Sequence, residues 1–235
     1  MSEVEKITMD EARELVSDAA LWPLVCEFLW NFAPQVHSSW LKGLETPLVS
    51  ADSHLLSSPR VKRAILSSLG VEPCFHTFPA DDGSRLLLLD SGTLEAIAKW
   101  LGALACADKL RSVTDGKTVR ALKAALPGIY PEVFGYTAYF KGLTIEDLGL
   151  KIVEGGVGKI GALGARTLLS FLGSLPASLV TRLRLKFPKA YSDESNPIPN
   201  PQSSISNLQS PSLNPQFLAK LLKLKFPEAY SLCCS

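Results

Sequence analysis

The sequence has no excess of either charge, because its 235 residues include 24 Lys and Arg against 23 Asp and Glu. A general nucleic-acid-binding protein needs a clear positive excess to neutralise phosphates, so we expect no nucleic-acid partner. The charge is uneven, however. Residues 1–18 hold six acids and two bases (net −4), and residues 166–235 hold eight bases and three acids (net +5). These two segments either attract each other or face different partners.

Signatures of disulfides and of membrane insertion are also lacking. The five cysteines are odd in number and have no CxxC spacing, which is typical of reduced thiols in a cytosolic protein. The acidic, polar N-terminus predicts no signal peptide. The most apolar stretch, residues 168–180, is interrupted by Ser170, Ser174 and Pro176, and it is shorter than the ~18 residues of a membrane helix. We therefore expect a cytosolic protein with no direct membrane insertion.

Motifs of catalysis and metal binding are absent as well. The three histidines, His37, His54 and His76, lie far apart, and Cys74 has no second pair to complete a zinc site. Neither HExxH nor GxSxG occurs. His37 is read either as a metal ligand or base, or as a partly buried histidine near Trp40, and the second interpretation is favoured. The sequence predicts no catalytic residue, no metal and no cofactor.

Residues 155–161 (GGVGKIG) resemble a phosphate-binding loop only in part. Val153 stands where the P-loop motif has its first glycine, and Ile160 stands where it has a Ser or Thr. The favoured interpretation is a helix break followed by close helix packing, and a nucleotide-binding switch is the weaker alternative. The small residues expected to pack are Gly161, Ala162, Gly164 and Ala165.

Apolar residues recur at helical spacing through most of the chain, and evidence for strands is thin. One exception is residues 74–89, where Asp81-Asp82-Gly83 is a turn signal between two apolar runs and favours a short β-hairpin. The fold class is therefore mainly α, with a single multi-helix globular domain over residues 1–192. Helices are expected after Ser58-Pro59, from Ser91 onward, and at 117–126, 131–141, 145–154, 159–172 and 176–186.

The last part of the chain has a different composition. Residues 193–214 are rich in Ser, Asn and Pro and contain four large aliphatic residues. Such a segment cannot bury enough apolar area to offset its ordering entropy, so it is predicted to be a flexible linker. Residues 215–235 then form a basic amphipathic helix at the C-terminus.

Residues 176–192 and 215–231 form an internal repeat with an offset of 39, in which ten of 17 positions are identical. Each copy begins at a proline and reaches Leu-Lys-Phe-Pro. Spacing of i, i+4, i+8 defines one apolar face per copy, a candidate interaction or packing face. These faces comprise Leu179, Leu183 and Phe187 in the first copy, and Leu218, Leu222 and Phe226 in the second.

The bases beside these faces are expected to remain solvated. They are Arg182, Arg184 and Lys186 in the first copy, and Lys220, Lys223 and Lys225 in the second. An isolated helix as short as the second copy is marginal in water, so it has to dock. It docks either on its own domain, where it completes the core, or in a groove of a partner.

Four segments, in this order, resemble the SctK (YscK) family of type III secretion sorting-platform proteins. They are NFAPQVH at 31–37, where Val36 replaces the family's usual tyrosine, the leucine run at 86–90 leading into 94–110, RLRLKFP at 182–188, and the terminal helix at 220–227. The resemblance implies a helical protein with no catalytic motif, no cofactor and no small-molecule substrate.

The same resemblance implies a place and a role. The protein would be cytoplasmic, peripheral to the inner membrane at the secretion apparatus. It would link the cytosolic domain of an SctD-like inner-ring protein to an SctQ-like pod protein and so help recruit the ATPase complex. The alternative function, from a different class, is a secretion chaperone or effector-binding helical protein.

Overall fold

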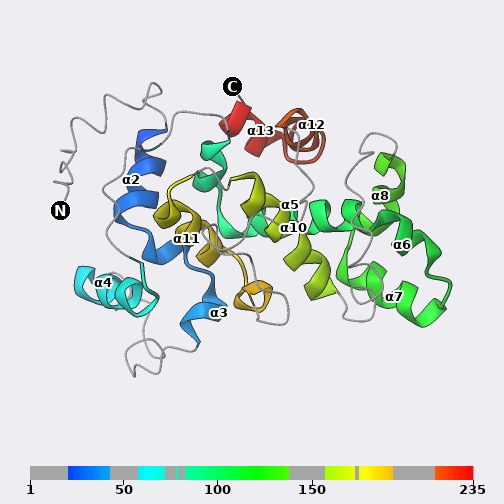
Figure 1. The fold of residues 1–235 in the computed structure, drawn as a ribbon, viewed down its shortest axis with the longest axis horizontal. Coiled ribbons are helices and arrows are strands. Elements are labelled where there is room, and N and C mark those ends of the chain that lie inside the picture. The colour runs from blue at the N-terminus through cyan, green and yellow to red at the C-terminus, as the bar shows by residue number, and fades with distance from the viewer. Residues whose placement is uncertain are drawn as a thin grey trace, which may run out of the picture.

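The computed structural model describes residues 21–42, 58–71, 78, 83–137, 157–172, 175–192 and 215–234. Within these ranges the fold is mainly helical, as expected, with eleven α-helices, three short 3-10 helices and no strand. The molecule is elongated, with α2 and α4 at one end, α6, α7 and α8 at the other, and α5 and α10 between them (Figure 1). The elements are α2 (Trp22–Trp30), η1 (Ala33–Gln35), α3 (Ser38–Leu41), α4 (Pro59–Ser68), η3 (Ser84–Leu88), α5 (Ser91–Ala105), α6 (Ala107–Ser112), α7 (Gly116–Ala125), α8 (Ile129–Tyr136), α10 (Val157–Phe171), α11 (Ala177–Lys186), η5 (Lys189–Ser192), α12 (Pro215–Lys225) and α13 (Pro227–Cys234).

Local sequence signals set several of the helix ends. Helix α4 has Pro59 in its first turn, where a missing N–H costs nothing, and Gly70 follows it with φ of +68°. Helix α5 is capped by Asp90, whose carboxylate accepts hydrogen bonds from the Thr93 N–H and hydroxyl at 2.9 and 2.6 Å. These signals fix where α4 begins and ends and where α5 begins.

Helices α5 and α10 form the centre of the molecule and touch through their backbones. A Cβ atom built on Gly102 of α5 would lie 1.9 Å from the Ile160 carbonyl oxygen, and one on Gly164 of α10 would lie 1.7 Å from that of Ala98. Both distances are far below van der Waals contact, so only glycine permits this approach. The prediction of close helix packing after the glycine-rich loop is thus confirmed.

The predicted hairpin is wrong in its second arm, because residues 84–88 form the 3-10 helix η3. Leu86, Leu87, Leu88 and Leu89 are all buried, whereas a hairpin strand with one wet face would alternate. Asp81 and Asp82 lie outside the described residues, as do the helix predicted at 145–154 and the linker predicted at 193–214.

Candidate interaction region around the two repeats

Both candidate faces are packed within the chain. The side chains of Leu179, Leu183 and Phe187 on the first copy are 0% exposed. On the second copy, Leu218 and Leu222 are 3% and 1% exposed, and the half-buried Phe226 packs against the same core. The first copy forms α11 and η5 inside the fold, and the second forms α12 and α13 on its periphery (Figure 1). An interaction with a partner through either face remains a prediction.

The first copy joins the segment after α2, although about 150 residues separate them in sequence. The His37 N–H donates to the Leu185 carbonyl at 2.8 Å, and the Trp40 indole N–H donates to that of Phe187, also at 2.8 Å. His37 is half-buried, and its Nδ1 accepts the Ser39 N–H at 3.2 Å at the start of α3. The fold thus brings the first and third family-like segments together, and His37 has the structural surroundings that were favoured for it.

Arg182 departs from the expectation of a solvated base, because its side chain is 2% exposed. Its Nη1 donates to the Phe28 carbonyl at 3.1 Å, and its guanidinium lies 5.2 Å from the centre of the Phe32 ring. A buried arginine is tolerated where its donors meet carbonyls and its planar group covers an aromatic face. Arg182 therefore connects α11 to α2 through a buried hydrogen bond.

Lys186 departs from the same expectation more strongly, because it is 0% exposed. Its Nζ donates to the carbonyls of Leu87 and Leu89 at 2.6 and 2.8 Å, and it lies 5.0 Å from the centre of the Phe28 ring. Burial lowers the pKa of Lys186 to about 7, against the opposing effect of nearby carboxylates. The sequence did contain a signal, because Lys186 follows the buried Leu183 by three positions and shares its helix face.

Lys225, the equivalent residue of the second copy, also contacts aromatic rings. Its Nζ lies 4.9 Å from the centre of the Trp100 ring and 4.6 Å from that of Tyr136, and it pairs with the Glu132 carboxylate. We call Trp100, Tyr136 and Glu132 the lysine socket. Lys220 and Lys223 of the same helix are exposed, as expected. The socket joins α12 to α5 and α8.

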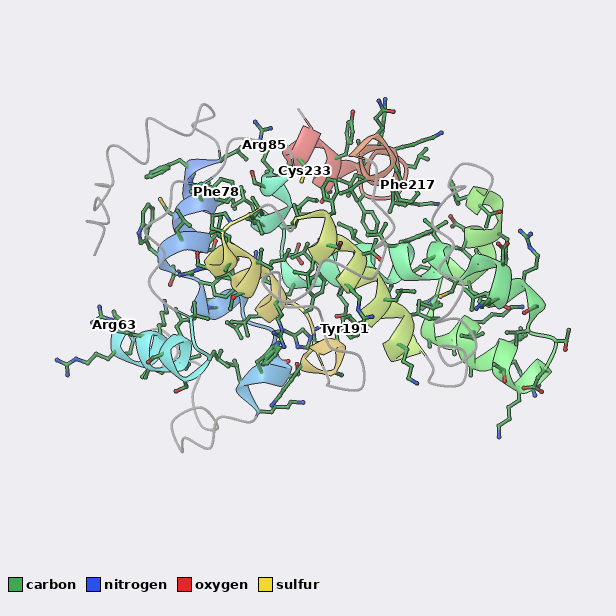
Figure 2. All side chains as sticks on the ribbon, viewed as in Figure 1. Arg63, Phe78, Arg85, Tyr191, Phe217 and Cys233 are labelled. Carbon is green, nitrogen blue, oxygen red and sulfur yellow. The ribbon has the colours of Figure 1, made fainter. Side chains whose placement is uncertain are left out.

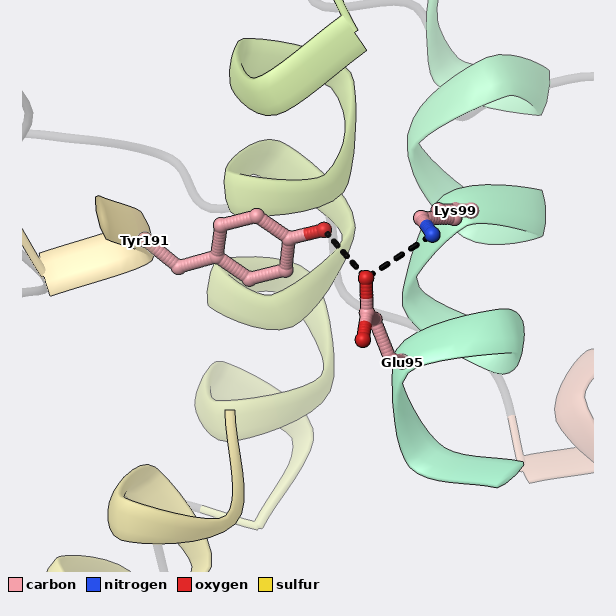
Figure 3. Close-up of polar contacts among 3 residues, drawn as sticks. All are labelled: Glu95, Lys99 and Tyr191. Carbon is pink, nitrogen blue, oxygen red and sulfur yellow. Dashed lines mark hydrogen bonds and ion pairs between the residues drawn. The ribbon is translucent and has the colours of Figure 1, made fainter. Parts of the chain in front are cut away.

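Tyr191, at the end of the first copy, lies across α10 and reaches α5 (Figure 3). Its hydroxyl lies 3.5 Å from Oε1 of Glu95, which also pairs with Lys99 at 2.8 Å. Burial and the Glu95 charge raise the pKa of Tyr191 above its usual value, so it stays a neutral donor. A Cβ on Gly161 would fall 2.1 Å from this hydroxyl, so Gly161 is a packing residue.

The two ends of the molecule carry exposed residues suited to contacts with proteins. Trp30 of α2 is 44% exposed and packs edge-to-face on Trp22, with ring centres 5.8 Å apart. Arg60 and Arg63 of the adjacent α4 are exposed, and Figure 2 shows Arg63 extending away from the body. At the other end, α7 exposes Lys117, Arg120 and Lys123. Tryptophan and arginine are enriched where binding energy concentrates in interfaces.

Comparison with known proteins identifies the family. The model for YOP proteins translocation protein K (YscK) matches residues 25–128, which run from α2 to the start of α8 and include two of the four family-like segments. No curated protein and no solved structure matches the chain.

Two features are absent from the described residues. No helix there is long and apolar enough to cross a membrane. That part of the chain also holds no group of three or more potential metal ligands. The family match shows that residues 25–128 are a YscK-family region, and this family is a structural family of type III secretion systems that is not known for enzymes.

Proposed function

We propose that this protein is a non-enzymatic adaptor of a type III secretion apparatus. It links the cytosolic domain of an SctD-like inner-ring protein to an SctQ-like pod protein, and so helps to position the ATPase complex at the cytoplasmic face of the inner membrane. The YscK-family domain at residues 25–128 is the observation that carries this proposal.

The distribution of exposed residues supports a role with two partners. The family-matched region contains both α4 and α7, which lie at opposite ends of the molecule (Figure 1). Trp30 of α2 and Arg60 and Arg63 of α4 are exposed at one end, and Arg120 and Lys123 are exposed at the other. Two separated basic surfaces allow two partners to bind at once without steric conflict. Rim charges of this kind steer association and select partners.

Capture experiments with surface variants test the proposal. Full-length protein carrying Trp30→Ala and Arg63→Glu is compared with protein carrying Arg120→Glu and Lys123→Glu, using the purified SctD-like domain and SctQ-like protein of the same system. Each double variant should weaken one partner by about tenfold or more and leave the other unchanged. Lys220→Glu, at an exposed position of α12, is the matched charge control.

The outcomes separate the candidate functions. Binding of neither partner by the wild-type protein, or loss of both partners with either double variant, contradicts the adaptor. Capture of secretion substrates in place of the two apparatus proteins favours the chaperone or effector-binding alternative.

A further inference from the structure

The two repeat copies place equivalent lysines against aromatic rings. Lys186 and Lys225 are 39 positions apart, the offset of the repeat. The Nζ of Lys186 lies 5.0 Å from the centre of the Phe28 ring, and that of Lys225 lies 4.9 and 4.6 Å from two such centres. A cation over an aromatic face is attracted by the ring quadrupole. Both copies of the repeat therefore carry, at the same position, a lysine whose Nζ lies against an aromatic surface.

The lysine socket has the composition of a site that recognises ammonium groups. Trp100 comes from α5, while Glu132 and Tyr136 come from α8, four positions apart on one helix face. The Trp100 and Tyr136 rings meet edge-to-face, with centres 5.8 Å apart and planes at 86°, so two ring faces and one carboxylate surround a single Nζ. Burial alone would lower the pKa of Lys225, but its hydrogen bonds to Glu132 and Tyr136 raise it.

The second copy is attached less completely than the first. Lys186 is 0% exposed, so withdrawing it would leave two carbonyls unpaired in the core. The side chain of Lys225 is 17% exposed and that of Glu132 is 48% exposed, so water can replace this ion pair. Exposed ion pairs contribute little to stability. The second copy can therefore leave its site without burying an uncompensated charge.

Apolar contacts complete the attachment of residues 215–234, which we call the C-terminal arm. Leu218, Leu221 and Leu222 of α12 are buried, and α13 packs on η3 through a face that includes the buried Cys233 (Figure 2). On the outside Leu224 is 50% exposed. The arm thus has the form of an amphipathic helix docked on the body of the protein, with leucine anchors and a terminal lysine.

We propose that the lysine socket and the part of the core that Leu218 and Leu222 cover form a binding site for an amphipathic basic helix of a partner protein, and that the C-terminal arm occupies this site as an internal ligand. The partner helix has leucines at i and i+4 and a lysine three positions later, the spacing of Leu218, Leu222 and Lys225. A ligand attached to the same chain competes at an effective concentration near the millimolar range. A partner helix must therefore bind tightly enough, or be concentrated enough, to displace the arm. The partner helix is expected to share the chemistry of the C-terminal arm, because the arm is the helix that fits this site.

A peptide-binding experiment tests the proposal with the full-length chain. Leu222→Asp places a charge at a buried anchor and should release the arm while the rest of the chain stays folded, which circular dichroism checks. A fluorescent peptide of residues 215–235, with serine in place of both cysteines, should then bind the variant saturably. The wild-type chain, with its site occupied, should bind this peptide much more weakly.

Matched peptides identify the role of the lysine. The Lys225→Met peptide should bind about tenfold more weakly than the parent, because it loses the aromatic and carboxylate contacts. The Lys223→Met peptide has the same net charge and should bind like the parent, because Lys223 contacts only Tyr230 of its own arm among the ring contacts of the described residues. Equal affinity of the two Met peptides, or no binding to a folded Leu222→Asp chain, would overturn the proposal.

Thiol labelling gives a second readout that does not depend on Leu222→Asp folding. In a chain whose only cysteine is Cys233, which is 1% exposed, the labelling rate reports release of the arm. Lys225→Met should raise this rate about tenfold, whereas Lys223→Met should leave it unchanged. Equal rates would contradict the proposal. Dimers of the wild-type chain that form by exchanging arms would also contradict it, because they would make a second copy the occupant. Neither result bears on the capture of the SctD-like and SctQ-like proteins.

Discussion

Replacement of the buried Lys186 by methionine should change how the stability of the protein depends on pH. In the folded chain burial lowers the pKa of Lys186 to about 7, against about 10.4 for a lysine in an unfolded chain. Between these values the unfolded chain holds a proton that the folded chain lacks. The contribution of Lys186 to the free energy of unfolding therefore rises as the pH increases from 7 towards 10, and it is lost as the pH falls through this window.

The size of the effect follows from the same two pKa values. One pKa unit corresponds to about 1.4 kcal/mol, and the folded group is half protonated at pH 7, so stability should rise by about 2 kcal/mol between pH 7 and pH 9. A neutral amine still has two N–H groups for the carbonyls of Leu87 and Leu89. Methionine has none. Each buried carbonyl left without a partner costs roughly 1–3 kcal/mol, so Lys186→Met should be destabilising at pH 9.

Urea unfolding followed by circular dichroism at pH 7, 8 and 9 measures both effects. The difference in unfolding free energy between wild type and Lys186→Met should widen by about 2 kcal/mol across this range. Lys189→Met, at an exposed position three residues away, is the matched control for the loss of a lysine. Parallel pH profiles for the wild type and Lys186→Met would refute the reasoning.

Three further predictions concern the packing and the organisation of the chain. Gly164→Ala should destabilise the protein by roughly 1–3 kcal/mol in urea unfolding, because the new Cβ meets the backbone of α5. Gly135→Ala, whose Cβ would lie in open space on α8, should be neutral or stabilising, and the reverse order of stabilities would contradict the packing of α5 on α10. Brief limited proteolysis should cut first within residues 193–214, as their composition predicts, and an initial cut elsewhere would show that the domain boundary is misplaced. Calorimetric titration of ATP, GTP and NAD should show no saturable binding, and micromolar binding that Lys159→Ala abolishes would restore the nucleotide-switch alternative.

The sequence predicted the parts of the fold that local chemistry decides. Pro59 and Gly70 mark the ends of α4, Gly128 marks the start of α8, and periodic leucines identify α5 and α11, because these signals act within a few residues. The end of α8 was predicted at 141, but the helix ends at Tyr136. Gly161 and Gly164 were identified as packing residues from the failure of the phosphate-loop motif, and both meet neighbouring elements.

The expectations that failed depend on contacts between distant parts of the chain. The hairpin prediction missed that Lys186, 97 positions after Leu89, donates to carbonyls that a strand neighbour would otherwise have paired. Arg182 and Lys186 were expected in solvent because a charged group is costly to bury. Their burial depends on carbonyls and aromatic rings from distant segments that include α2 and η3. The lysine socket likewise joins residues from two helices and holds a lysine from a third, so no local sequence pattern predicts it.

In the proposed function, one molecule of this protein binds two apparatus proteins at once. Mass photometry of the full-length chain mixed with the SctD-like cytosolic domain and the SctQ-like pod protein measures this directly, because each species is resolved by its mass. The adaptor predicts a ternary species that contains all three chains and that is absent when this protein is omitted. Two binary complexes that exclude each other, or no complex with either protein, would contradict the adaptor function.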